Sequence, residues 1–497
     1  MKASKLIKLF LLSSFVLAGC EFSDLMFWKK KDEPEQQENQ EGEEQTPGEG
    51  GEQSGEQGGE GGEVTPPEDP TFKTTVNVKM EKLLKGDNGY YNIDYQYSDG
   101  FFKEDAEVYD KDLAMLSLGA ALSATYQQWV TDFLSTCKFE NPTLHDFDKE
   151  PTKDTLGYAL AHKEIDGSEL FTVLIRGHEY KAEWQNNFII GEEGDHEGWL
   201  ARSTELYSAL SSYINTYKAS KTVKLWIVGY SRAGAISNLL SSLILRSDGI
   251  NVNPKNMFVY TFEAPASLCE EHVHEYKNIH NIINSADLIT YIPPTQYGLS
   301  RVGTDFEIYD SDISNLIKKF DSQVEIPEFV ECDKSTFNNQ DIEDDVDFTR
   351  YIINDIFSNK NNATYSAHTR ELYVANYQEG LSYSIGLMFA LTGTTRSQMM
   401  TALTNLGMGA ITMLSDTTGA ALAEFLKTYL NQDNVDYDND KLIESCAVLV
   451  KAATYLFITE LFMFMGSSYG DNLKRSINMH YPEVTYTLLQ NAHSKLD

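Results

Sequence analysis

Short apolar runs alternate with helical patterns along the middle of the chain. Four compact runs, partly β-branched, occupy residues 170–175, 223–228, 257–262 and 279–283. Continuous apolar runs of this length are typical of strands that are buried on both faces, as in a parallel sheet. Residues 203–217 follow a helical pattern after the first run, and residues 235–245 form an apolar helix after the second. This alternation predicts a doubly wound α/β layer.

Another helix is expected before these strands. Residues 110–129 place leucine and alanine side chains at helical spacing behind Asp110, an acidic residue suited to the N-cap. The pattern predicts an amphipathic helix, with one apolar side against the core.

The first 19 residues have the pattern of a secretion signal. Three lysines precede an apolar run at residues 9–17 that is too short to span a bilayer, and small residues follow it. Residues 17–20, Leu-Ala-Gly-Cys, resemble the bacterial lipobox, which implies cleavage before Cys20 and a lipid on that residue. An ordinary secretory signal with a chance cysteine is the alternative.

The next segment is low in complexity. It contains 14 acidic residues and no basic ones between Asp32 and Asp69, interspersed with Gly, Gln and Pro. Such a segment cannot bury apolar surface and its charges repel one another, so we expect an extended, disordered tether.

Composition adds two constraints. The 497 residues include 40 basic and 75 acidic side chains, for a net charge of −35, which argues against a nucleic-acid partner because phosphates are bound through Lys and Arg. The hydrophobic content of 41% is enough for a sizeable core.

Four further cysteines could pair in three ways, although their wide spacing shows no small disulfide framework; they are Cys137, Cys269, Cys332 and Cys446.

The candidate chemistry lies at the turn after the second predicted strand. Residues 229–234, Gly-Tyr-Ser-Arg-Ala-Gly, approximate G-x-S-x-G, the nucleophile elbow, in which small neighbours let a serine occupy a strained strand-to-helix turn. The string alone is a loose pattern, but a strand before it and an apolar helix after it supply the required setting. Ser231 is therefore a candidate nucleophile, and a glycine-rich turn that only packs is the alternative.

Around this turn the chain resembles the lipase class 3 family of α/β-hydrolases, over much of residues 110–294. Residues 174–178, Leu-Ile-Arg-Gly-His, are similar to the family's strand and R-G-T/S loop, and Trp184 follows in a familiar place. Three later matches complete the resemblance: residues 196–199 with H-x-G-F, residues 260–265 with T-F-G-x-P, and residues 284–294 with N-x-x-D-x-V…P-P. Four positions depart from the family pattern: Tyr230 replaces His, Arg232 replaces Leu, Ala233 replaces Gly, and His178 replaces Ser or Thr.

The resemblance implies an α/β-hydrolase fold and a triad in the chain order Ser, acid, His. A serine hydroxyl needs an imidazole to take its proton and a carboxylate to orient that imidazole. Ser231 would be the nucleophile and Asp287 the acid, with a capping role as the alternative for Asp287. The backbone N–H groups of Arg232 and His178 would form the oxyanion hole.

Three histidines follow Asp287 in the chain and are candidates for the base: His368, His480 and His493. His480 begins His-Tyr-Pro-Glu, in which Pro482 suits the first turn of a terminal helix. This string resembles the C-terminal H-x-P-E-x-x-Y stretch of some bacterial relatives. We favour His480, with His368 as the alternative.

Other histidines have weaker claims to a function. Residues 270–275, Glu-Glu-His-Val-His-Glu, contain metal-ligand residue types, but histidines at i and i+2 point to different faces of a helix. We expect a solvated charged face there and no metal or other cofactor. His196 is expected to be a satisfied loop histidine, and His178 either polarises substrate or packs beside Trp184.

Asp287 and His480 are 193 positions apart, which exceeds what the fold requires and predicts an insertion. Residues 387–430 and 442–465 are rich in Met, Leu, Ala and Phe, and charges within the second run argue against a membrane span and for a helical cap. A methionine stripe could line an acyl-chain surface, but we favour plain core; it comprises Met399, Met400, Met408 and Met413.

The sequence thus predicts an α/β-hydrolase with a doubly wound, mostly parallel sheet and a large helical insertion between the acid and the histidine. The expected segments are a signal (1–19), a lipidated Cys20 with its tether (20–70), the core (71–302), the insertion or cap (303–470) and the C-terminal part of the core (471–497). The expected activity is hydrolysis of carboxylic esters, acylglycerols or similar lipids foremost, by a lipid-anchored protein outside the cytoplasm. The alternatives are a non-catalytic surface binding lipoprotein with a degenerate hydrolase fold, and a triad that acts on peptides or on polysaccharide acyl groups.

Overall fold

The computed structural model describes residues 71–495, except 86–88, 150–151, 153, 178–180, 336–339, 357–368, 391–419, 421–422, 425, 429, 432–433 and 456–469. The predicted signal, the lipidation at Cys20 and the tether therefore lie outside the described residues. Within the described part, no helix combines the length and the apolar character that a membrane crossing requires.

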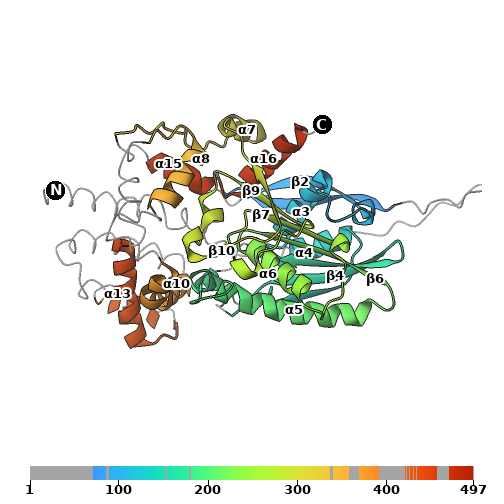
Figure 1. The fold of residues 1–497 in the computed structure, drawn as a ribbon, viewed down its shortest axis with the longest axis horizontal. Helices are drawn as coiled ribbons and strands as arrows, with labels where there is room; N and C mark the ends of the chain where they lie inside the picture. Colours follow the sequence, from blue (N-terminus) through green and yellow to red (C-terminus); the bar gives the residue numbers. More distant parts are fainter. Residues whose placement is uncertain are drawn as a thin grey trace, which may run out of the picture.

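A seven-stranded sheet forms the centre of the molecule (Figure 1), in the order β11-β9-β7-β6-β5-β4-β3. Five neighbouring strands from β11 to β5 run parallel, and β4 and β3 continue antiparallel at one edge. Their bounds are β3 (Glu140–His145), β4 (Tyr158–Ile165), β5 (Ser168–Ile175), β6 (Thr222–Tyr230), β7 (Met257–Phe262), β9 (Ile279–Asn284) and β11 (Thr304–Ile308). The four predicted strands are confirmed as β5, β6, β7 and β9, and the doubly wound, mostly parallel sheet is confirmed with them.

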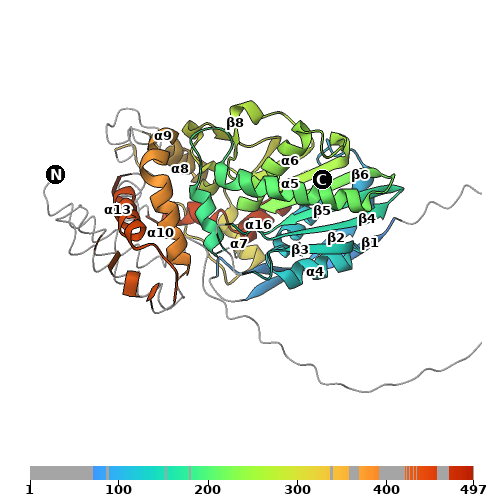
Figure 2. The same ribbon diagram turned by 90° about the horizontal axis from the view of Figure 1, so that it is seen from below.

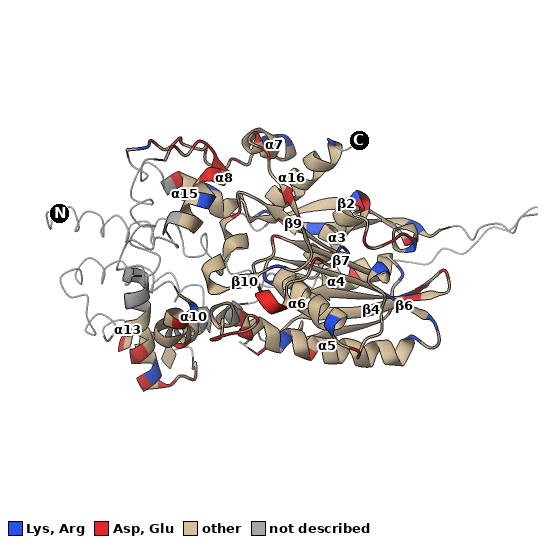
Figure 3. Cartoon of the chain, in the orientation of Figure 1, with Lys and Arg blue, Asp and Glu red and all other residues tan. Residues whose placement is uncertain are grey.

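Residues 225–228 of β6 are apolar without interruption because both faces of the sheet are covered. On β6, Trp226 and Val228 belong to the core on one face of the sheet, whereas Leu225 and Ile227 belong to the core on the other. Successive side chains of a strand point to opposite faces, so a strand covered on both sides must be apolar at every position. Figure 3 shows the result: the strands of the sheet carry few charged residues, which lie mainly on loops and helices.

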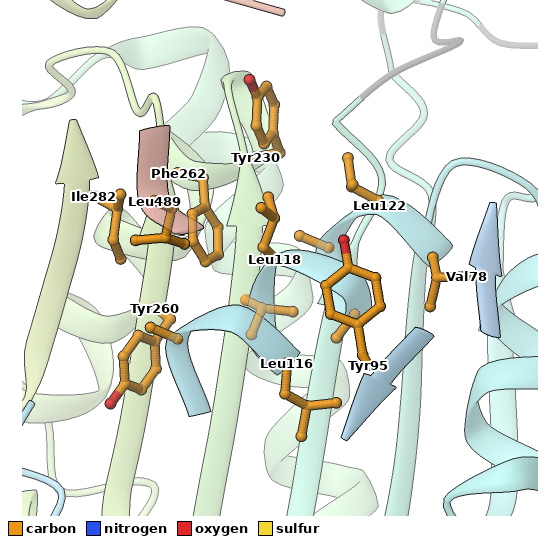
Figure 4. Close-up of a cluster of buried hydrophobic side chains, with 14 of the residues drawn as sticks. Val78, Tyr95, Leu116, Leu118, Leu122, Tyr230, Tyr260, Phe262, Ile282 and Leu489 are labelled. Carbon is orange, nitrogen blue, oxygen red and sulfur yellow. The ribbon is translucent and has the colours of Figure 1, made fainter. Parts of the chain in front are cut away.

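Helices cover both faces of the sheet (Figure 2). On one face lie α5 (Glu197–Tyr217) and α6 (Arg232–Arg246), which pack against each other and against the central strands. On the other lie α3 (Lys111–Ser123), α4 (Gln127–Thr136) and α16 (Pro482–Ser494). A hairpin of β1 (Lys73–Glu81) and β2 (Tyr90–Ser98) packs against α3 from outside, so α3 lies between the hairpin and the sheet (Figure 4).

The predicted helix over residues 110–129 is present but differs in two respects. Asp110 is its N-cap, accepting hydrogen bonds from the amides of Asp112 (2.8 Å) and Leu113 (2.9 Å). However, α3 ends at Ser123, and α4 begins only at Gln127. The expectation of an amphipathic helix was wrong, because the hairpin covers the side that a two-layer packing would leave to solvent.

The segment between Asp287 and His480 contributes the strand β11 to the sheet. The boundary expected at residue 303 was wrong, because β11 follows it directly and pairs in parallel with β9. Beyond β11 the described residues are mainly helical, and α10 packs against α13 (Figures 1 and 2). The helices are α7 (Ile313–Phe320), α8 (Asp345–Tyr351), α9 (Arg370–Tyr373), α10 (Glu379–Ala390), α13 (Asn439–Tyr455) and α15 (Gly470–Asn478). The four methionines of the predicted stripe lie outside the described residues.

Short elements complete the described chain. The strands β8 (Leu268–Cys269) and β10 (Leu299–Ser300) form a small antiparallel pair. Six 3₁₀-helices are η1 (Asp99–Lys103), η2 (Lys181–Phe188), η3 (Pro254–Asn256), η4 (Glu270–His272), η5 (Leu288–Tyr291) and η6 (Thr295–Tyr297), and two π-helical turns are η7 (Ile352–Ile356) and η8 (Val374–Gln378).

The four cysteines that could have paired are all free thiols: Cys137, Cys269, Cys332 and Cys446. Three of them are buried, and burial raises the pKa of the Cys332 thiol to about 11 and that of the Cys446 thiol to about 12. Each thiol therefore stays protonated and packs as a small apolar group.

Leu118→Ala should lower the free energy of unfolding by about 2–5 kcal/mol, because Leu118 is fully buried between the hairpin and the sheet. Val108→Ala is the control, since Val108 is 65% exposed and its truncation should change stability by less than about 0.5 kcal/mol. Urea unfolding followed by circular dichroism measures both. A Leu118 effect as small as that of Val108 would show that α3 is not packed as described.

Candidate active site

Ser231 occupies the turn between β6 and α6 in a strained conformation. Its φ is 56° and its ψ is −126°, in a region that residues other than glycine rarely adopt. The turn is held from both sides, because the Ser231 amide donates to the carbonyl of Phe262 on β7 (2.7 Å) and its own carbonyl accepts the first bond of α6 from Ala235 (3.2 Å). The side chain is half-buried, so its hydroxyl remains accessible.

The turn has room only for small neighbours. A Cβ on Gly229 would lie 2.3 Å from the carbonyl oxygen of Ala233, and a Cβ on Gly177 would lie 2.2 Å from that of Tyr230. Real Cβ atoms do not approach that closely, so glycine is required at both positions. The second contact brings the Arg-Gly loop after β5 against the elbow. His178, the next residue of that loop, lies outside the described residues.

His480 and Asp287 reach Ser231 from distant parts of the chain. The His480 Nε2 lies 2.8 Å from the Ser231 Oγ, and its Nδ1 lies 2.5 Å from the Asp287 Oδ2. Asp287 is fully buried and His480 is 3% exposed. The structure therefore brings the three predicted residues into one hydrogen-bonded line, with only the serine end open to solvent.

Asp287 uses its two carboxylate oxygens for different purposes. Oδ1 accepts a hydrogen bond from the amide of Ile289 (2.8 Å), which caps η5. Oδ2 faces His480. Asp287 therefore caps η5 with one oxygen, as the alternative interpretation expected, and the cap fixes the direction of the other oxygen, which meets the imidazole.

The loop that carries His480 is anchored to the strand ends beside Ser231. The hydroxyl of Tyr230 donates to the carbonyl oxygen of His480 (2.8 Å), and the side-chain amide of Asn284 donates to that of Met479 (3.0 Å). Tyr230 ends β6, and Asn284 ends β9. The helix predicted after His480 is confirmed as α16, with Pro482 in its first turn.

His493 is not part of this line. The Nε2 of His493, on α16, lies 2.8 Å from the hydroxyl of Tyr109. His368 lies outside the described residues. His196 is fully buried and stacks on Trp199, with ring centroids 3.6 Å apart, and burial lowers its pKa to about 3. His196 therefore stays neutral and packs by stacking on Trp199.

Arg232 contributes to the site through its backbone and its side chain. It is the first residue of α6, where the helix dipole favours negative charge. Its guanidinium is buried and donates from Nη1 to the Glu183 Oε2 on η2 (2.9 Å). The other oxygen of Glu183 accepts from the Arg176 Nη2 (2.6 Å) and from the Thr155 hydroxyl (2.8 Å). Sequence reasoning missed Glu183, since nothing in its local pattern indicates two arginine partners.

One group of three potential metal-ligating side chains occurs within the described residues, formed by Asp195, Cys269 and His272. The His272 Nδ1 lies 2.8 and 2.9 Å from the two Asp195 oxygens and 3.4 Å from the Cys269 Sγ. Arg246 lies 3.7 Å from the same carboxylate and offsets its charge. The donors are thus bonded to one another, as in a structural hydrogen-bond cluster. The expectation that His272 belongs to a solvated face was wrong in this respect, whereas His274 is exposed.

Comparison with known proteins relates this site to lipases. Residues 165–297 match the family Lipase (class 3). Among solved structures, the Rhizomucor miehei lipase in its propeptide complex is 18% identical with a TM-score of 0.32, and the match covers 41% of this chain and 70% of that one. The lipase from Rhizopus microsporus var. chinensis is 16% identical with a TM-score of 0.30, covering 39% and 74% respectively. No curated protein matches the chain.

The fold is that of an α/β-hydrolase, with the strained turn at Ser231 after a central parallel strand. The segment that matches the lipase family contains Ser231 and Asp287, whereas His480 lies outside it. The position of His480 is therefore a contribution of the three-dimensional structure alone.

Glu183→Ala should lower the free energy of unfolding by about 3–5 kcal/mol, because it leaves two buried arginines without their shared carboxylate. Glu205→Ala is the matched control: Glu205 pairs with Arg202 at 2.8 Å, but its side chain is 62% exposed, so the expected loss is below about 1 kcal/mol. Guanidinium unfolding of both variants measures the difference. Equal losses would contradict a role for Glu183 in holding η2 to α6.

Proposed function

We propose that this protein is a serine hydrolase of carboxylic esters, with Ser231 as nucleophile, His480 as general base and Asp287 as the carboxylate that orients His480. The observation that carries the proposal is the hydrogen-bonded line from the Ser231 Oγ through both nitrogens of His480 to Asp287, at a strained turn. The family match over residues 165–297 supports an ester as the substrate class.

We assign a group to each step of the proposed reaction. The His480 Nε2 takes the proton of the Ser231 hydroxyl as its oxygen attacks the ester carbonyl. The backbone N–H of Arg232 at the start of α6 stabilises the resulting oxyanion, and we assign the second donor to the N–H of His178. The imidazolium then gives its proton to the leaving alcohol. Water repeats the sequence on the acyl-enzyme and releases the acid.

Lipid esters such as acylglycerols are the substrates that we propose, since the family match is to lipases. A panel of p-nitrophenyl esters of graded acyl length tests this choice. A preference that rises with chain length supports it, whereas activity confined to acetyl esters would contradict it.

Loss of Ser231 or His480 should abolish turnover without unfolding the protein. Ser231→Ala and His480→Ala should each lower kcat by about a thousandfold or more, and the double variant should be hardly worse, because residues that act as a unit show non-additive losses. His493→Ala is the control, since His493 contacts Tyr109 and not Ser231.

Labelling with a fluorophosphonate probe supplies an independent readout, because only an activated serine reacts with it. Wild type should be labelled and Ser231→Ala should not. Probe uptake by the Ser231 variant, or full turnover in the His480 variant, would overturn the assignment.

We also propose that the protein is anchored to a bacterial membrane, outside the cytoplasm, by a lipid on Cys20. The support is the Leu-Ala-Gly-Cys string after the apolar run, together with an acidic segment long enough to separate the anchor from the hydrolase.

Cys20→Ser should remove the lipid and shift the protein from the membrane fraction to the soluble fraction. Hydrolysis of a soluble short-chain ester should persist, because the acidic segment separates Cys20 from the site. Metabolic labelling with a fatty-acid analogue, followed by fractionation, measures the first effect. Lipid that remains on the serine variant would refute the anchor.

A further inference from the structure

Glu263 is a buried carboxyl group beside the proposed triad that the mechanism above does not use. It follows β7 directly and is fully buried. Its φ is 48°, in the left-handed region where glycine is favoured. A long acidic side chain in a strained, water-free position points to a specific role for that side chain.

The contacts of Glu263 join the loops that carry the acid and the base. Its Oε2 accepts from the amide of Asn284 (2.9 Å), three residues before Asp287. Its Oε1 accepts from the hydroxyl of Thr485 (2.9 Å), five residues after His480. The Thr485 hydroxyl also lies 2.8 Å from the Tyr230 hydroxyl. Glu263 therefore lies at the junction of β7, β9, α16 and the elbow.

The carboxyl group of Glu263 also lies within hydrogen-bond reach of the carboxyl group of Asp287. Two carboxyl groups can share such a bond only if one of them carries a proton, since ionised carboxylates are acceptors only. Burial, and then the charge of Asp287, raise the pKa of Glu263 well above its usual range. Asp287 accepts from the amide of Ile289 and faces the imidazole of His480.

Other ionisable groups surround this pair. His480 contacts Asp287, and the pKa of Tyr230 is raised well above its usual value by burial and by the nearby carboxyl groups. Glu483 on α16 is buried, which raises its pKa to about 7. Arg301 lies on the other side and donates to the carbonyl of Ala264 (3.1 Å).

We propose that Glu263 is a positioning residue that stays protonated and donates a hydrogen bond to the carboxylate of Asp287. The inference rests on the proposed triad and deepens it. The bond holds the Asp287 carboxylate so that Oδ2 faces the His480 Nδ1.

Two substitutions of similar size separate the hydrogen bond from packing. Glu263→Gln keeps a donor, its amide N–H₂, whereas Glu263→Met fills the same volume with no donor. We expect kcat of the Met variant to fall by about tenfold or more relative to the Gln variant, with little change in KM, because a buried hydrogen bond to a charged group is lost. Thermal unfolding of both variants checks that the fold persists.

The pH profile gives a readout that packing alone would not move. The acid limb of the pH profile of kcat/KM reports protonation of the general base. Without the donor, Asp287 keeps more negative charge and stabilises the imidazolium, so the acid limb of the Met variant should shift upward by about half to one pH unit. The Gln variant should keep the wild-type limb. The proposal would be overturned if the Gln and Met variants had equal kcat values and equal acid limbs in their pH profiles.

Infrared difference spectroscopy covers the case in which the Met variant does not fold. The spectrum of wild type minus Glu263→Gln at neutral pH should contain the C=O stretch of a protonated carboxyl group, and a carboxylate band in its place would overturn the proposal. Ser231→Ala distinguishes a failure of the proposed function from a failure of the proposed role of Glu263. Full turnover without Ser231 refutes the proposed function, whereas an essential Ser231 beside identical Gln and Met variants refutes only the role of Glu263.

Discussion

The hydrogen bond from the Tyr230 hydroxyl to the carbonyl oxygen of His480 joins the two parts of the chain on which the site depends. Tyr230 directly precedes the proposed nucleophile, whereas His480 follows 250 residues later. A serine and its base must stay within hydrogen-bond reach, so a link between their backbones sets the geometry of the whole line. Position 230 departs from the family pattern described above, and the tyrosine hydroxyl supplies this link from a buried position.

Two buried carboxyl groups also hold together the segments around the Ser231 turn. Glu183 binds Arg176 and Arg232 and thereby holds η2 to the start of α6. Glu263 binds the amide of Asn284 and the hydroxyl of Thr485 and thereby holds β9 to α16. Each carboxyl joins segments that are far apart in sequence. Both are nearly or fully excluded from water, where polar contacts are strong and unpaired groups are costly.

The sequence predicted the parts of the fold whose signals are local. The strands β5, β6, β7 and β9 are continuous apolar runs, and Ser231 lies in a recognisable strand-turn-helix string. The edge strand β11 escaped prediction because it is short and largely exposed, with Asp305 and Glu307 among its five residues. The partners of Glu183 and Glu263 escaped for a different reason, since their contacts arise only when distant segments fold together. His480 could be favoured by its neighbouring proline but was placed only by the structure.

The long segment between Asp287 and His480 is compatible with a precise triad because its two ends are held at the same point. The carbonyl of Ala286 accepts from Thr349 on α8 (2.9 Å) and from Ser476 on α15 (3.3 Å). Arg475 and Asp345 join the same two helices through two parallel bonds. Closing a longer loop costs only slightly more entropy once its ends are fixed. The middle of the segment can therefore vary without moving His480. Its helix α10 packs on η2, so variation there would reach the wall of the site while the catalytic line stays in place.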